Sequence, residues 1–377
     1  MKINCSLFEL AFCRFLIYNR KNEAYGDNFT IAPVLKRSNM TARERCLQVF
    51  EGKTVDRLPN FNIIMGFSAA YCGKTYRQYV SDHRVLCECD LRCAEDFRLD
   101  ILSAISDPMR EAESFGAEVL LPEDGVPYSP APLIADLSQI RRLKAAAPEN
   151  SPRTLDRLKS VEYFKTIGKD YCIGGWVEGA FAECCDLRGI DRFLMDIALE
   201  EPDFIHEFLE KTCEQAIRFA LLQIQAGADI IGIGDAAASL ISPAMFEEFA
   251  FPYQKRIVEA VHRAGARTKL HICGNTSAVL PQMIETGSDI LDLDWMVDIG
   301  SAKRLLQDKT TILCGNYDPV AVLLQGSPEK IARKVNECAD AVGSYYLSSA
   351  GCEVPRDTPA ENLLAVADAL AARTPNA

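Results

Sequence analysis

The chain has 377 residues, of which 48% are hydrophobic, so it can bury a large core in one domain or two. Its 41 Lys and Arg against 53 Asp and Glu give a formal net charge of −12, which disfavours nucleic-acid binding because phosphates require cations. No run of about 18 apolar residues occurs, so no membrane span is expected. The 15 cysteines are scattered and odd in number, which is typical of a reduced, cytoplasmic protein rather than of a disulfide scaffold.

The N-terminal segment differs in character from the rest of the chain. Residues 1–39 are partly apolar but interrupted by charges, and they lack the basic start and small-residue cleavage site of a signal peptide. Thr41, followed three residues later by Glu44, then forms a capping box that predicts the start of a helix. We expect residues 1–39 to be an extension outside the fold, with Met40 as a candidate natural start, and residues 40–377 to form one domain.

From residue 58 onward, short apolar runs alternate with helical patterns. Most of the runs are continuously apolar, as parallel strands buried on both faces should be. Eight β/α repeats in about 340 residues predict a single (β/α)8 TIM barrel. A doubly wound sheet is the alternative, but the only G-x-G after a strand, Gly232 and Gly234, lacks the third glycine of a dinucleotide loop. The predicted strands are 58–64, 117–122, 171–176, 228–235, 268–274, 289–295, 311–316 and 344–351.

Polar residues stand near the ends of these predicted strands. In a TIM barrel the chemistry takes place at the C-terminal ends of the strands, so this position selects candidates. The candidate catalytic residues are Asp235, Glu178 and, from between two helical segments, Asp107, and the candidate substrate-binding residues are Asn62, Trp176, Asp294 and Asn316.

One set of residues has the composition of a metal site. His271 and Cys273 are two apart on a predicted strand, so their side chains point to the same side. On its own such a pair is more often packing than ligand, but Cys352, just past the last predicted strand, opens onto the same mouth. Two thiolates and an imidazole with one open position suit catalytic zinc better than Mg²⁺ or Ca²⁺. Asp294 and Asp235 are candidates for a fourth ligand or a close partner.

The segments MTARER, EGKTVDRLP, ISDPMREAESFGAE, GGWVEGAFAECCDLRG, AGADIIGIGDAAAS, HICGN and GCEVPRDTPAENL together resemble the uroporphyrinogen decarboxylase superfamily over residues 40–377. The His-x-Cys pair with a late Cys is similar to its cobamide-dependent, methylcobamide:coenzyme M-like methyltransferase branch. That resemblance implies a zinc enzyme that moves a methyl group between a corrinoid (cobalamin-type cofactor) held by a partner protein and a thiol or other small donor or acceptor. It also implies that Asp107 matches an aspartate that recurs across the superfamily.

The decarboxylase branch, which acts in the porphyrin pathway, is the alternative function. Its members carry an arginine-rich motif after the first strand that holds the substrate carboxylates. The corresponding stretch here, IIMGFSAAY at 63–71, has no arginine. The serine and the late histidine of that branch correspond to Ala236 and Cys352. A substrate with several carboxylates would lack its cationic partners, which favours methyl transfer.

Overall fold

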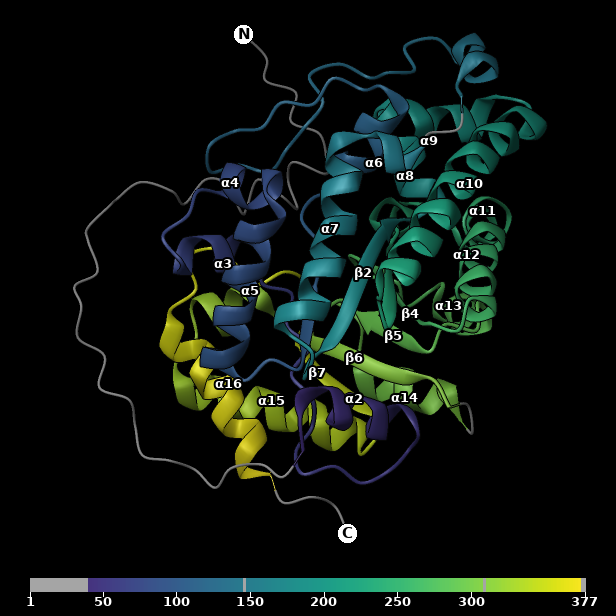
Figure 1. Ribbon diagram of the computed structural model, residues 1–377. Helices are drawn as coiled ribbons and strands as arrows, with labels where there is room; N and C mark the ends of the chain where they lie inside the picture. Colours follow the sequence, from purple (N-terminus) through teal and green to yellow (C-terminus); the bar gives the residue numbers. More distant parts are fainter. Residues whose placement is uncertain (1–39, 145–146, 308–309, 374–377) are drawn as a thin grey trace, which may run out of the picture. The chain divides into compact units, whose positions relative to one another are not determined.

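The computed structural model describes residues 40–144, 147–307 and 310–373; the predicted extension at 1–39 lies outside these ranges. Within them, seven parallel strands form one sheet in sequential order, and helices pack around it (Figure 1). This confirms the predicted α/β barrel fold. The strands are β1 (Ile101–Ser103), β2 (Cys172–Glu178), β3 (Ile230–Gly234), β4 (Arg267–Ile272), β5 (Ile290–Leu293), β6 (Ile312–Tyr317) and β7 (Tyr346–Ala350).

A short extended segment joins the two edges of the sheet. Phe61 donates its N–H to the carbonyl of Ser348 at 2.8 Å, and the Ser348 N–H donates to Pro59 at 2.9 Å. On the other side, the Asp100 N–H donates to the carbonyl of Asn60 at 2.9 Å. The first predicted strand therefore takes the eighth position between β7 and β1, although it pairs only through one isolated bridge, Asn60 to Ser348.

One predicted strand is wrong and one real strand was not predicted. Residues 117–122 lie outside the barrel sheet, where Leu120 forms an isolated antiparallel bridge with Tyr128 and is 40% exposed. A central barrel strand needs both faces buried, which this segment lacks. Strand β1 takes the place in the sheet that was predicted for residues 117–122. Its three residues directly follow a helical pattern, so periodicity alone does not separate the strand from the helix.

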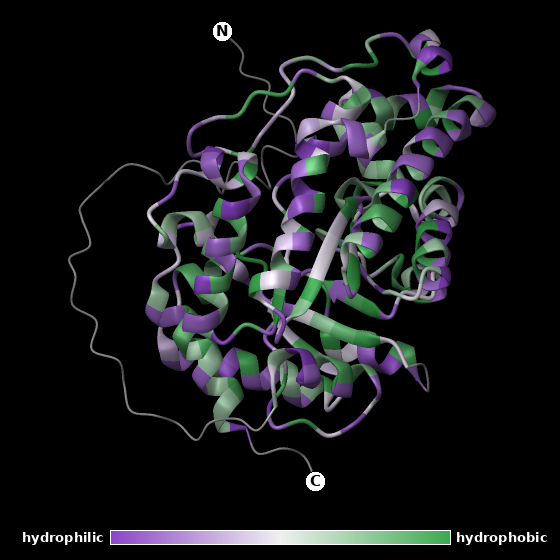
Figure 2. Cartoon of the chain, in the orientation of Figure 1, coloured by the Kyte–Doolittle hydropathy of each residue, from purple (hydrophilic) through white to green (hydrophobic). Residues whose placement is uncertain are grey.

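The helices turn apolar residues toward the sheet and polar residues toward solvent, as the hydropathy colouring shows (Figure 2). No helix in the described part of the chain combines the length and apolarity needed to cross a bilayer. The helices are α2 (Ala42–Phe50), α3 (Met65–Tyr71), α4 (Tyr76–Ser81), α5 (His83–Phe97), α6 (Met109–Phe115), α7 (Pro152–Ile167), α8 (Ala180–Arg188), α9 (Ile190–Leu199), α10 (Pro202–Ala226), α11 (Pro243–Phe249), α12 (Phe251–Arg263), α13 (Leu280–Glu285), α14 (Ile299–Leu306), α15 (Pro328–Val342) and α16 (Ala360–Ala372), with shorter turns η1 (Leu137–Arg142), η2 (Pro148–Asn150), η3 (Ala236–Leu240) and η4 (Pro319–Leu324).

The predicted capping box at the start of α2 is confirmed. The Glu44 N–H donates to Thr41 Oγ1 at 3.1 Å, and the Thr41 N–H donates to Glu44 Oε2 at 2.8 Å. These two bonds satisfy backbone donors that the first helical turn leaves without partners. They set the entry of the chain into the barrel.

Buried ion pairs hold the N-terminal end of the barrel, opposite the mouth. Asp100 is fully buried and accepts from Arg45 Nη1 at 2.5 Å and from Arg57 Nη1 at 2.6 Å. It also accepts from the backbone N–H of Asn60 at 2.7 Å, while Asp56 accepts from Arg45 Nε at 2.6 Å. Because each buried charge has an opposite partner, this network ties the first helix and the closing segment to the sheet.

Candidate metal centre

The three predicted metal ligands lie together at the C-terminal end of the sheet. His271 is the second-to-last residue of β4, Cys273 follows that strand, and Cys352 follows β7. His271 Nε2 lies 3.1 Å from Cys273 Sγ, and Cys273 Sγ lies 3.7 Å from Cys352 Sγ. All three ligand atoms fall within 4.8 Å of one another. They are the only such group of His, Cys, Asp and Glu side chains found among the described residues.

These distances suit a tetrahedral ion. Zinc–sulfur bonds of about 2.3 Å at tetrahedral angles place two thiolates about 3.8 Å apart, close to the separation of Cys273 and Cys352. The imidazole nitrogen, 3.1 Å from Cys273 Sγ, stands somewhat nearer to that thiol than two ligands of one tetrahedral ion do. Hydrogen bonds from Cys273 and His271 lower the pKa of Cys352 well below its usual value, although burial opposes this. The pKa of Cys273 is raised instead, chiefly by its hydrogen bond to Cys352. The donor set has the softness and spacing that zinc prefers.

The neighbouring strand β5 orients the imidazole of His271. Its Nδ1 lies 3.1 Å from the carbonyl oxygen of Asp292 on β5. A carbonyl can only accept, so Nδ1 carries a proton, and Nε2 is the nitrogen that faces the cysteines and would bind an ion. The Asp292 carboxylate lies 3.4 Å from the same nitrogen and pairs with Lys269 Nζ at 2.6 Å. Lys269 and Asp292 were not predicted as site residues, although Asp292 alternates with Asp294 in the sequence.

Trp176 on β2 occupies the barrel interior beside this group. Its indole ring centroid is 6.4 Å from that of His271, and Lys269 Nζ lies 5.5 Å from the centre of the indole. A Cβ added at Gly232 would approach the indole to 2.1 Å, and one at Gly234 to 2.8 Å. The G-x-G of β3 therefore makes room for a tryptophan rather than for a dinucleotide.

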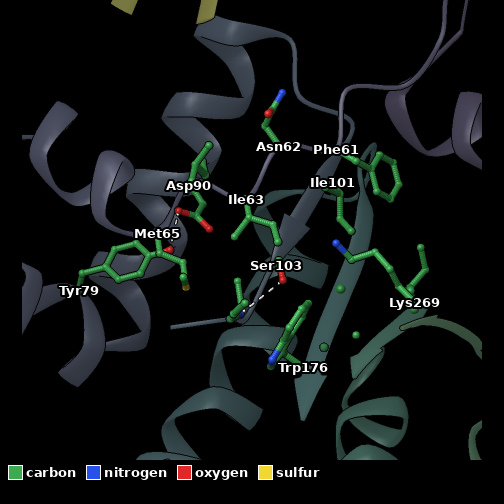
Figure 3. A pocket seen from close by; sticks show the side chains of 16 residues that line it. Phe61, Asn62, Ile63, Met65, Tyr79, Asp90, Ile101, Ser103, Trp176 and Lys269 are labelled. Carbon is green, nitrogen blue, oxygen red and sulfur yellow. Dashed lines mark hydrogen bonds between the residues drawn. The ribbon is translucent and has the colours of Figure 1, made fainter. Parts of the chain in front are cut away.

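A cavity of about 30 Å³ lies within the barrel below the mouth (Figure 3). Asn62, Trp176 and Lys269 share its lining with Ser103 and Asp90. This volume holds about one or two water molecules and is too small for a substrate.

Glu178, at the end of β2, faces the same side of the sheet as Trp176, two residues earlier. It accepts from Trp176 Nε1 at 3.1 Å and lies 3.5 Å from Arg110 Nη2. Burial raises the pKa of Glu178 well above its usual value, partly offset by Arg110 and reinforced by Glu111. The strand register aligns Glu178 with Gly234 of β3, and Gly234 with His271. Glu178 and His271 are thus two strand spacings apart, roughly 10 Å.

Asp107 is engaged by protein donors. Its carboxylate forms an ion pair with Arg153 and accepts from Ser106 Oγ at 2.8 Å and from the Met109 N–H at 3.1 Å. Burial raises its pKa, but Arg153 and Arg110 reverse this and hold the pKa below its usual value. The bond to Met109 satisfies the first backbone N–H of α6. The described contacts of Asp107 are those of a side chain that holds the β1–α6 loop, and its predicted catalytic role stays a prediction.

Asp235 likewise has two protein partners. Its Oδ1 accepts from the Ala182 N–H at 2.7 Å, and its Oδ2 accepts from Gln254 Nε2 at 2.7 Å. Burial raises the pKa of Asp235 to about 6, although both hydrogen bonds oppose this. The side chain is fully buried and caps the first turn of α8 from the end of β3. It does not join the metal group.

The remaining candidates form part of the framework around the mouth. Asn62 donates to Tyr317 Oη at 2.8 Å and accepts from the Ala350 N–H at 2.8 Å. Asn316 donates to the carbonyl of Asp294 at 3.0 Å and so holds the loop after β5. Asp294 is 4% exposed and accepts from the Met296 N–H at 2.9 Å. Burial raises its pKa, and it lies outside the three-residue metal group.

A sequence model of the uroporphyrinogen decarboxylase (URO-D) family matches residues 41–373. The chain belongs to the uroporphyrinogen decarboxylase family. It is 27% identical over 332 residues to the uroporphyrinogen decarboxylase of Synechococcus sp. (strain JA-3-3Ab), covering 85% of this chain and 90% of that protein. It is 34% identical over 209 residues to the methylcobamide:CoM methyltransferase MtbA of Methanosarcina mazei, covering 55% of this chain and 60% of that protein.

A solved structure described as a methyltransferase from Methanosarcina mazei shares the fold. It superposes with a TM-score of 0.80 at 22% sequence identity, covering 88% of this chain and 98% of that chain. The chain is therefore an enzyme of the uroporphyrinogen decarboxylase superfamily, of either its decarboxylase or its methyltransferase branch. Decarboxylases align with more of the chain, whereas the methyltransferase alignment covers about half of it.

Proposed function

We propose that this member of the family is a zinc-dependent methyltransferase. It moves a methyl group between a corrinoid carried by a partner protein and a thiol or another small donor or acceptor. The observation that supports this most is the group formed by His271, Cys273 and Cys352, whose ligand atoms lie within 4.8 Å of one another at the barrel mouth. Decarboxylation needs no such group.

His271, Cys273 and Cys352 would hold the ion and leave one coordination position for the substrate. Bound zinc supplies a Lewis acid that keeps a thiol ionised near neutral pH, and so provides a nucleophile. Asp292 holds the His271 ring by its carbonyl oxygen. Trp176, packed against Gly232 and Gly234, forms the floor under the substrate position.

The decarboxylase alternative has one observation in its favour, the longer alignment with decarboxylases. The composition of the expected carboxylate-binding region argues against this alternative. Segment 63–71 carries no arginine, and Asp107 already forms an ion pair with Arg153. The same purified protein tests both functions.

The test is zinc quantification together with methylcobalamin demethylation, assayed across thiols and tetrahydrofolate. We expect about one zinc per chain and transfer to at least one acceptor. Protein that contains no zinc, binds none on titration and releases CO₂ from a porphyrinogen would contradict the proposal.

Apolar side chains at the rim of the mouth support a macromolecular corrinoid carrier. Leu240 follows β3, Trp295 and Met296 follow β5, and Val320 follows β6, and each is between 36% and 49% exposed. Exposed apolar groups gathered around a reactive site are typical of a contact surface.

Replacing Trp295 tests this surface. Trp295→Ala should slow transfer from a protein-bound corrinoid by about tenfold, the cost of one moderate interface side chain, and leave transfer from free methylcobalamin unchanged. Leu305→Ala, at a 48% exposed apolar residue on α14, is the control and should change neither rate. An equal loss with both methyl donors would mean that Trp295 acts on the site and not on the carrier.

A further inference from the structure

Helices α3 and α5 pack against each other through small side chains, and three of these are cysteines. Cys72 caps the C-terminal end of α3, and Cys89 and Cys93 stand one turn apart on α5. Cys72 Sγ lies 3.8 Å from the carbonyl oxygen of Cys89, and Cys93 Sγ lies 3.7 Å from Ser68 Oγ, one turn before Cys72. The two helices therefore run antiparallel here, with Cys72 opposite Cys89 and Ser68 opposite Cys93.

The thiols of this group also interact with one another. Side-chain hydrogen bonds with Cys89 and Cys93 lower the pKa of Cys72, burial opposes this, and the nearby Arg92 lowers the pKa further. The same bonds, together with burial, raise the pKa of Cys89 and of Cys93. Cys72 is thus the member of the group that ionises first, while the two cysteines on α5 keep their protons. The thiolate, and not the thiol, is the nucleophile in disulfide chemistry.

Cys72 also differs from most other cysteines in its exposure. Among the cysteines that the structure describes, all are buried except Cys72, Cys273 and Cys352, which are partly exposed. Two of these three are the candidate metal ligands. Cys72 is therefore the one described cysteine outside the metal group that a dissolved reagent reaches in the folded protein. An accessible, ionised thiol beside a second thiol is the arrangement of redox-active cysteines.

We propose that Cys72 is an oxidisable thiol that reacts with hydroperoxides and then forms a reversible disulfide bond with Cys89. A disulfide requires close backbone approach, and the Cys72 sulfur already reaches the backbone of Cys89. Cys93, one turn further along α5, faces Ser68 instead. This inference does not depend on the metal centre or on methyl transfer.

The reaction takes place in two steps. The Cys72 thiolate attacks a peroxide oxygen, so that an S–O bond forms, the O–O bond breaks, and the other oxygen leaves and takes up the proton that Cys72 released. The Cys89 sulfur then attacks the sulfur of Cys72, so that the S–S bond forms, the S–O bond breaks, and hydroxide leaves with the Cys89 proton as water. The two sulfurs lose the two electrons that the hydroperoxide gains.

Peptide mapping of the full-length protein tests the proposal. The protein is reduced, freed of reductant and treated with hydrogen peroxide, and the remaining thiols are blocked with iodoacetamide before digestion. We expect one peroxide-dependent product from this region, in which the peptides of Cys72 and Cys89 are joined and which dithiothreitol separates. Trypsin cleaves after Arg92 and so releases the three cysteines on different peptides, namely 58–74, 85–92 and 93–98.

Two matched variants test the choice of partner. Cys89→Ser should abolish the joined product and leave Cys72 as a sulfenic acid, which dimedone traps. Cys93→Ser is the control, because it removes the same group one turn away on the same helix, and it should keep the bond between Cys72 and Cys89. If Cys89→Ser does not fold, fragmentation of the joined peptides from the wild-type protein still identifies the partner, since it distinguishes Cys89 from Cys87.

The alkylation rate of Cys72 tests its ionisation separately. At pH 6 an ordinary thiol with a pKa of about 8.5 is less than about 1% ionised. We expect Cys72 in the folded protein to react with iodoacetamide at least about tenfold faster at pH 6 than the same residue in urea-unfolded protein.

The contrary results are equally specific. A bond from Cys72 to Cys93 or to Cys87 would overturn the assignment of the partner. Protein in which peroxide leaves Cys72 as a free thiol would overturn the proposal. Slower alkylation of Cys72 in the folded than in the unfolded protein would overturn its role as the attacking thiolate.

Discussion

The two ends of the barrel use charged and polar residues in opposite ways. At the N-terminal end, Asp100 is surrounded by Arg45, Arg57 and a backbone N–H, and its charge is compensated. At the mouth, Glu183 is 2% exposed and its carboxyl oxygens have no hydrogen-bond partner, and the three candidate metal ligands lie together. Paired groups stabilise a fold, whereas unpaired groups cost stability unless a ligand satisfies them. The paired groups make the N-terminal end structural, and the mouth is the end where we propose the chemistry.

The largest expected effect comes from removing a metal ligand at the mouth. Cys352→Ala leaves His271 and Cys273 as the only two protein ligands, too few for a catalytic zinc site. We expect zinc to be lost on dialysis and methyl transfer to fall by at least about 1,000-fold, with little change in fold. Zinc content and initial rates are the measurements. Cys72→Ala, at a half-buried cysteine on the outside of the barrel, should retain both, and a Cys352→Ala protein with full activity would remove the basis for the proposed function.

Asp100→Asn tests the opposite end. It removes the shared acceptor of Arg45 and Arg57 and leaves buried guanidinium groups undercompensated, which costs about 3–5 kcal/mol. Urea unfolding should show this loss, while the zinc affinity of the folded protein stays unchanged. Glu259→Gln, in an exposed ion pair with Arg263, should cost less than about 0.5 kcal/mol. A similar cost for both variants would mean that the N-terminal network contributes little.

Asp90 on α5 differs from both, because it is a buried acid held by neutral donors. It accepts from Ser68 Oγ at 2.7 Å and from Tyr79 Oη at 2.9 Å. Burial raises the pKa of Asp90 to about 7, although both hydrogen bonds oppose this. Between its unfolded pKa and pH 7 the folded protein keeps a proton that the unfolded chain has released. Stability from this group is therefore present at low pH and is lost as the pH rises.

The expected loss is about 3 kcal/mol between pH 4.5 and pH 8. Asp90→Asn cannot ionise, so its free energy of unfolding should lack this part of the pH dependence. Urea unfolding of both proteins across this range measures the difference. Parallel pH profiles for the wild type and the variant would contradict the elevated pKa.

The smallest expected effect concerns Trp176, which lies between the mouth and the interior. Gly232→Ala would place a Cβ 2.1 Å from the indole and force Trp176 to move, at a cost of about 1–3 kcal/mol. Only two tryptophans are present, so fluorescence in a Trp295→Phe background reports Trp176 alone. Gly300→Ala on α14, where the nearest atom is 3.5 Å away, is the control and should be neutral or slightly stabilising. An unshifted spectrum in Gly232→Ala would show that the indole does not depend on this glycine.

Much of the barrel could be predicted because parallel strands buried on both faces leave continuous apolar runs in the sequence. The same rule failed where a segment was apolar but half exposed, as at 117–122, and where a strand was only three residues long, as at Ile101–Ser103. Six of the eight predicted strands coincide with strands of the seven-stranded sheet, 58–64 forms only an isolated bridge, and 117–122 lies outside the sheet.

The alternation of strands and helices follows from the order of apolar residues along the chain, which also predicts His271 and Cys273 on one side of a strand. The 3.7 Å distance between Cys273 and Cys352, 79 positions further on, depends on the fold, because the curled sheet brings the ends of β4 and β7 to one mouth. It also decided that Asp235 caps a helix while Glu183 lacks a partner. A polar residue near a strand end looks the same in the sequence in either case. Its role depends on the donors that distant segments bring to it.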